Sequence, residues 1–157
     1  RVLFRSAYDS AQLLQKAEAF CAYQERCSAE VIEKLVRLGA QEDEITGLLE
    51  SLRAQNYLND TRFVAAYISG KLRIKKWGVQ KIRAGLNAKR IERSLVESLL
   101  KELPFQEEYQ LILKELAQRK WNELSREKDN WTRQQKLYRF LQARGFRYED
   151  FAELRFD

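Results

Sequence analysis

The densest run of charged side chains in this sequence lies between Lys71 and Arg93. These 23 residues contain nine basic residues and one acid, Glu92, so the segment carries a net charge of +8. The whole chain has a net charge of +6, so all other residues together sum to −2. A cluster of Lys and Arg at this density favours an anionic partner, either a phosphate backbone or an acidic protein surface. The alternative interpretation is the ordinary solvated face of helices.

The spacing of these basic residues assigns them to helix surfaces. Arg83, Asn87 and Arg90 lie four and three residues apart, which places them on one outward stripe when Ile82 and Leu86 face inward. Lys71 and Lys75 form a similar stripe on the preceding helix. We therefore predict a binding face made of Lys71, Arg73, Lys75, Lys76, Lys81, Arg83, Asn87, Lys89 and Arg90. Trp77 lies among these charges and either stacks on a partner or packs at the turn, and packing is the favoured role for a Trp.

The residue types that usually carry catalysis or bind metals are scarce. The chain has no histidine, its six glycines are scattered rather than gathered in a phosphate-binding loop, and two cysteines without histidine do not make a zinc site. Cys21 and Cys27 are six residues apart, which on one helix exceeds disulfide reach, so we expect two small apolar residues in a reducing compartment. We predict no enzyme activity, no metal and no cofactor.

An apolar helical pattern occurs three times and must supply the framework for the basic residues. The first copy consists of Val31, Leu35, Gly39, Ile45, Leu48, Leu49 and Leu52. The second, 51 positions later, consists of Ile82, Leu86, Arg90, Val96, Leu99, Leu100 and Leu103. The third, another 55 positions on, consists of Leu137, Leu141, Gly145, Phe151 and Leu154. A period of about 50 residues indicates an array of supersecondary units, and such arrays usually bind macromolecules.

These patterns predict an all-α protein of three tandem three-helix repeats that form an elongated, curved array. We expect the first repeat, with an N-terminal extension, at 1–58, the second, basic repeat at 59–103 and the third at 104–157. Within them, a first helix reaches about Arg26, Ser28 caps the next helix, and Gly39 and Gly145 occupy left-handed positions at helix ends. Arg90 replaces glycine at the corresponding place, where a left-handed conformation would be somewhat strained, so we expect that turn to differ in detail.

Helix pairs joined by a short turn also raise the possibility of a helix-turn-helix, in which the second helix of the pair reads bases. Here that helix carries Glu92, Glu97 and Glu102 beside Arg93 and Lys101, a mixed and rather acidic surface. The positive charge lies on the preceding helix. Contact with a phosphate backbone therefore fits better than sequence-specific recognition.

Four motifs in this order resemble those of the RecX family of recombinase regulators, in particular its shorter forms with a Lys-Trp-Gly motif. The resemblance runs from about Ala11 to Leu154 and begins with the run from Ser28 to Leu35 followed by Gly39. The other motif residues are Asp60, Arg62, Phe63, Trp77, Gly78, Arg139, Arg144, Gly145 and Phe146. The sequence departs from the family at Cys27, where Ser or Thr is usual, and at Arg90, where Gly is usual.

The resemblance implies a non-enzymatic regulator that binds the groove of a RecA–DNA filament and limits filament growth, ATP hydrolysis and strand exchange in DNA repair and recombination. It implies contact with the DNA backbone without base recognition, a cytoplasmic location and no membrane association. We expect a monomer in solution. Two alternatives stay open: a sequence-independent DNA-binding protein that acts without RecA, and a scaffold whose apolar or acidic faces bind other proteins.

Overall fold

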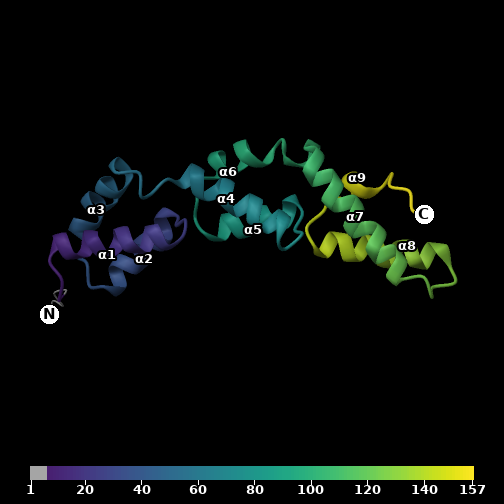
Figure 1. Ribbon diagram of the computed structural model, residues 1–157, viewed down its shortest axis with the longest axis horizontal. Helices are drawn as coiled ribbons and strands as arrows, with labels where there is room; N and C mark the ends of the chain where they lie inside the picture. The colour runs from purple at the N-terminus through teal and green to yellow at the C-terminus, as the bar shows by residue number, and fades with distance from the viewer. Residues whose placement is uncertain (1–6) are drawn as a thin grey trace. The chain divides into compact units, whose positions relative to one another are not determined.

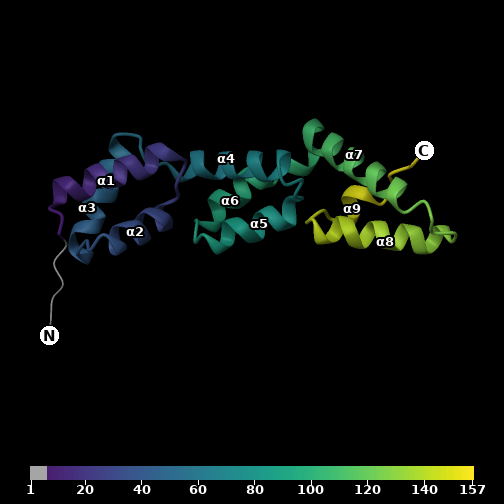
Figure 2. The ribbon, with the colours of Figure 1, turned by 60° about the horizontal axis from the view of Figure 1, so that its bottom comes forward.

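The computed structural model describes residues 7–157, and these form α-helices, one short 3-10 helix and no strand (Figures 1 and 2). The elements are α1 (Ser10–Tyr23), α2 (Ser28–Arg37), α3 (Glu42–Ala54), α4 (Asp60–Arg73), α5 (Val79–Ala88), α6 (Arg93–Leu100), η1 (Leu103–Phe105), α7 (Glu107–Glu123), α8 (Asn130–Ala143) and α9 (Tyr148–Phe151). The predicted all-α architecture of three-helix repeats is confirmed. No helix in the described part of the chain is long and apolar enough to cross a membrane.

The described chain forms two compact units. The first extends to Ala66 and also includes Lys89–Ile91, and the second contains Tyr67–Ala88 together with Glu92–Asp157. The first unit therefore holds α1 to α3, the start of α4 and the turn after α5, whereas the second holds the other residues of the second repeat and all of the third.

The core of the first unit comes from the apolar residues that recur at helical spacing. Leu13 of α1, Val31 and Leu35 of α2 and Leu52 of α3 are all fully buried, and the three helices pack on one another. Burial of a leucine side chain of this kind contributes about 1.5–3 kcal/mol to folding. The recurring apolar positions thus form the core, as their spacing predicts.

Two predicted helix ends in the first unit are wrong. Helix α1 ends at Tyr23 rather than near Arg26, and Ser28 is the first residue of α2 instead of its N-cap. Cys27 takes the cap position, where its backbone N–H donates to the Glu30 carboxylate at 3.0 Å. Burial alone would raise the pKa of Glu30, but the hydrogen bonds from Cys27 and Lys89 lower it. Ser28 is free to bond elsewhere because Glu30 satisfies this helix end.

The Asp60, Arg62 and Phe63 motif ties the start of α4 to the first repeat. Ser28 donates to the Asp60 carboxylate through its backbone N–H at 3.0 Å and its hydroxyl at 2.9 Å. Arg62 pairs with Glu25 at 2.6 Å and also donates to a backbone carbonyl. Phe63 is 6% exposed. The motif therefore holds helices together within the first unit.

The turn that contains Arg90 keeps the left-handed conformation of its glycine counterparts. Arg90 has φ +58°, against +89° at Gly39 and +98° at Gly145. The turn therefore differs from its counterparts only in detail, through a smaller positive φ. A left-handed non-glycine residue costs about 1–2 kcal/mol, less than the burial of one core side chain such as the fully buried Leu86, so the chain keeps the helix packing.

The second and third repeats are joined at the first residues of α5. The backbone N–H groups of Gly78, Val79 and Gln80 donate to the Arg144 carbonyl at 2.8 Å, the Tyr109 hydroxyl at 3.0 Å and the Gly145 carbonyl at 2.9 Å. The first N–H groups of a helix have no partner within the helix, so they need acceptors from elsewhere. For α5 these three acceptors all come from the third repeat.

Tyr109 is the only side chain among these acceptors, and replacing it with Phe should destabilise the second unit. The residue is fully buried, and burial raises the pKa of its hydroxyl far above the ordinary value, so the group stays protonated. Tyr109→Phe leaves the Val79 N–H without its acceptor, which should cost about 1–3 kcal/mol in the free energy of unfolding measured by urea titration. Tyr148→Phe is the control, since Tyr148 is 58% exposed and should tolerate the change. Equal losses in both variants would contradict this role.

Candidate nucleic-acid interface

Trp77 holds two lysines of the predicted face. The ammonium nitrogens of Lys71 and Lys81 lie 4.8 and 4.9 Å from the centroid of its ring, and Lys71 also lies 5.3 Å from the ring of Tyr67. A cation over an aromatic face is attracted by the ring quadrupole, worth about 0.5–1 kcal/mol at an exposed site. The half-buried indole therefore packs against the chain's own lysines and restricts where their charges lie.

Lys75 and Lys76 lie in the connection between α4 and α5. Helix α4 ends at Arg73, so the predicted helical stripe of Lys71 and Lys75 is wrong. The reason is the left-handed Lys76, at φ +57°, which turns the chain so that Gly78 can pack against Gly145. Neither Lys75 nor Lys76 forms an ion pair with any residue of 7–157, although Lys76 lies near enough to Glu108 to contribute to the lowered pKa of that carboxyl.

Two arginines of the predicted face are instead paired with acids in the second unit. Arg73 binds Glu108 at 2.5 Å and holds the pKa of that carboxyl below its usual range. Arg83 binds Glu97 at 2.8 Å, and its side chain is only 30% exposed. These pairs reduce the positive charge that the two residues offer to a partner. Surface pairs of this kind contribute about 0–1 kcal/mol each to stability.

The last residues of the predicted face, Lys89 and Arg90, belong to the first unit. Lys89 pairs with Glu30 at 3.4 Å and lies 5.8 Å from the Phe63 ring. Arg90 is exposed but lies beyond the end of α5 at Ala88, so the predicted stripe through Arg83, Asn87 and Arg90 stops at the exposed Asn87. Of the nine predicted residues, three are thus committed to ion pairs within the chain.

The C-terminal motif residues mostly position other groups. Phe146 is 2% exposed and packs on Tyr109 with ring centroids 5.4 Å apart. Gly145 fits against Lys81, where an added Cβ would lie 2.5 Å from the Lys81 Cβ. Arg144 is half-buried and donates to the Lys75 carbonyl at 2.6 Å. Arg139 alone is exposed, on α8, with no ion pair within residues 7–157.

Sequence reasoning missed a second basic segment. Residues 130–146, which form α8 and the turn after it, contain four basic residues and no acid, namely Arg133, Lys136, Arg139 and Arg144. This segment is less conspicuous than the basic cluster of the middle repeat, because the basic residues of 130–146 are spaced along a helix rather than clustered. The complete absence of acids is the signal that could have found it.

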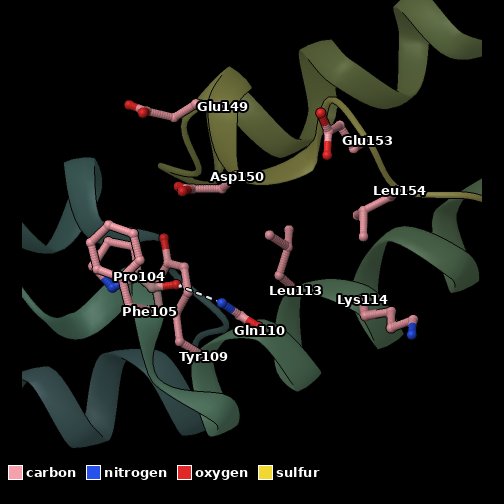
Figure 3. A pocket seen from close by; sticks show the side chains of 10 residues that line it. All are labelled: Pro104, Phe105, Tyr109, Gln110, Leu113, Lys114, Glu149, Asp150, Glu153 and Leu154. Atoms are coloured by element: carbon pink, nitrogen blue, oxygen red, sulfur yellow. Dashed lines mark hydrogen bonds between the residues drawn. The ribbon is translucent and has the colours of Figure 1, made fainter.

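A pocket of ≈ 360 Å³ lies between η1, α7 and α9 (Figure 3). Its lining residues are Pro104, Phe105, Tyr109, Gln110, Leu113, Lys114, Glu149, Asp150, Glu153 and Leu154. In Figure 3 the carboxylates of Glu149 and Asp150 lie across the pocket from Phe105. Asp150 is already paired with Arg147 at 2.7 Å. The lining includes no Ser, Thr, Cys or His, and the described residues contain no cluster of His, Cys, Asp and Glu suited to a metal ion.

Comparison with known proteins identifies the family. The models of the second and third three-helix domains of RecX match residues 59–100 and 106–153. Regulatory protein RecX of Clostridium perfringens strain SM101 is 33% identical over 121 residues, which are 76% of this chain and 56% of that protein. The chain thus spans about half the length of the first curated relatives that it matches.

For a further relative and a solved structure, the match with this chain covers a larger share of the matched protein. Regulatory protein RecX of Pectobacterium atrosepticum is 26% identical over 148 residues, 94% of this chain and 86% of that protein. The crystal structure of RecX from Lactobacillus salivarius matches with a TM-score of 0.81 over 90% of each chain at 23% identity, which supports the fold. With the motif order and the repeated three-helix fold, these matches show that the chain belongs to the RecX family of regulatory proteins.

Proposed function

We propose that this chain binds a RecA–DNA filament and limits ATP hydrolysis and strand exchange by RecA. Membership of a family of regulatory proteins supports the proposal. The observation that carries it is the group of lysines around the α4–α5 turn, Lys71, Lys75, Lys76 and Lys81, none of which forms an ion pair within residues 7–157. A cytoplasmic monomer that acts through binding, without chemistry of its own, is part of the same proposal.

The expected contact is with the phosphate backbone of the filament's DNA and with acidic protein surface beside it. The ammonium groups of Lys71 and Lys81 are held at Trp77, whereas at Lys75 it is the backbone that is held, because its carbonyl accepts from Arg144 of the third repeat. Restrained cations lose less side-chain entropy on binding than free ones, which favours affinity. Glu97 of α6, together with Glu92 and Glu102 beyond its two ends, argues against base recognition by that helix.

The test adds the purified protein to RecA, single-stranded DNA and ATP. We expect ATP hydrolysis and strand exchange to fall as the protein concentration rises. The control without RecA measures whether the chain hydrolyses ATP itself. If hydrolysis and strand exchange stay constant at every ratio of the two proteins, the proposal is wrong.

The second candidate is a sequence-independent DNA-binding protein that acts without RecA. The same unpaired lysines favour it, since an exposed basic cluster needs no recombinase to attract phosphate. Titration onto bare DNA and onto the assembled filament separates the two candidates. Much tighter binding to the filament supports the first, whereas equal affinities with a steep loss in salt support the second.

A further inference from the structure

Helix α8 and its C-cap carry three arginines that have no acidic partner within residues 7–157. Arg133, Phe140 and Arg144 lie seven and four residues apart, so they share one side of the helix, whereas the exposed Arg139 lies about 100° around the helix from Phe140. Arg133 and Arg144 are about 16 Å apart at 1.5 Å per residue.

The arginines on this side are held in place without losing their charge. Arg133 donates to the Trp121 carbonyl at 3.1 Å through Nε, and its guanidinium lies 3.8 Å from the Trp121 ring centroid. Arg144 donates to the Lys75 carbonyl at 2.6 Å and lies 5.7 Å from the Phe140 ring. Carbonyls and rings orient a guanidinium but leave its full charge, unlike a carboxylate.

The two lysines near these arginines are different. Lys120 lies 4.8 Å from the Phe140 ring but pairs with Glu123 at 3.5 Å. Lys136 pairs with Glu127 at 3.0 Å. Arg133, Arg139 and Arg144, by contrast, have no acidic partner anywhere in residues 7–157. We call these three residues the α8 arginine strip.

The strip is continuous with the basic turn of the second repeat. The bond from Arg144 to the Lys75 carbonyl places the end of the strip against the connection that carries Lys75 and Lys76. Both belong to the second compact unit. The charges of the two repeats are therefore held in a defined arrangement.

We propose that the α8 arginine strip is a second phosphate-binding surface, and that one nucleic-acid strand passes from the α4–α5 turn onto it. The second surface extends the DNA contact described under the proposed function, and its role in the cell rests on that function. Binding to bare DNA is enough to test the surface itself. Planar guanidinium groups pair with phosphate oxygens through two parallel hydrogen bonds. Three such groups along one helix with no acid among them suit a polymer with regularly repeated negative charge.

The experiment measures the affinity of the whole chain for a fluorescently labelled oligothymidylate at several salt concentrations, without RecA. Arg133→Gln and Arg139→Gln should each weaken binding about three- to tenfold. Each should also reduce the slope of log affinity against log salt by about 0.7, the value for one lost phosphate contact on a single strand. Arg139→Lys keeps the charge and should keep the slope.

Arg37→Gln is the control, because Arg37 is an exposed arginine on α2 of the first unit that is paired with Glu33 at 3.8 Å, so its loss should leave the slope unchanged. Unchanged thermal unfolding checks that the Arg133 and Arg139 variants fold. Wild-type slopes in both variants, or no DNA binding by the parent protein at low salt, would overturn the proposal. Displacement of the DNA by poly-glutamate at equal charge concentration would overturn it in favour of an acidic protein partner. The variants can change the salt slope even if the parent protein does not regulate RecA, and the parent can regulate RecA even if the slopes do not change. The two proposals can therefore fail separately.

Discussion

Replacing Gly145 with Ala is expected to lower the free energy of unfolding of the second unit by about 3 kcal/mol or more. Gly145 has φ +98°, a conformation that side-chain-bearing residues rarely adopt. An added Cβ would also lie 2.5 Å from the Lys81 Cβ and 2.6 Å from the Lys81 backbone nitrogen. The chain would have to move this turn away from α5, and the hydrogen bonds to Gly78 and Gln80 would weaken with it.

Tryptophan fluorescence during urea titration measures this effect. The three tryptophans of the chain, Trp77, Trp121 and Trp131, all lie in the second unit, so their signal reports unfolding of that unit. The control is Gly47→Ala in α3 of the first unit, where an added Cβ would meet no atom within 4 Å. That change should stabilise α3 by about 0.5–1 kcal/mol and leave the tryptophan signal unchanged. A Gly145→Ala protein that unfolds like the parent would show that the tight turn is not required.

The triple change Lys75→Glu, Lys76→Glu and Lys81→Glu is expected to raise the protein concentration that halves RecA ATP hydrolysis by about a hundredfold. Each reversed charge should cost roughly 1 kcal/mol of binding free energy, so the three together weaken binding by about a hundredfold. Arg83 is left unchanged, because a glutamate there would face Glu97 and would destabilise the fold. Loss of regulation would then report lost binding rather than unfolding.

The matched control reverses the same number of charges at exposed lysines away from the α4–α5 turn: Lys101→Glu, Lys114→Glu and Lys128→Glu. We expect this variant to regulate RecA within about threefold of the parent, since only weak, salt-screened attraction is changed. An equal loss in both triple variants would mean that net charge alone drives binding. The lysines of the turn would then have no special role.

The repeated helices could be predicted from the sequence because their signal is local. Leu35, Leu86 and Leu141 stand at equivalent places of the three patterns, and all three are fully buried. A helix turns by the same angle at each residue, so the spacing of apolar residues reports the buried side directly. The glycine at the end of α2 and that at the end of α8 were predictable for the same reason, since left-handed residues at helix ends favour glycine.

Helix ends were less predictable, because tertiary contacts decide them. Lys75 continues the helical spacing of Lys71, yet α4 stops at Arg73 so that Gly78 can approach Gly145. Arg90 shows the reverse case, in which the chain keeps a left-handed turn without glycine. The loss of a favourable local conformation is outweighed in both places by packing that involves residues distant in the sequence.

The sequence by itself determined the helices, their buried sides and the sum of charge in each segment. Only the tertiary structure decided which charges are free, since Arg73, Arg83 and Lys89 find partners 35, 14 and 59 positions away. It also decided that the first N–H groups of α5 are satisfied by Tyr109, Arg144 and Gly145 of the next repeat. Ion pairs and hydrogen bonds depend on distances of about 3 Å in space, and spacing along one helix carries no information about a partner on another.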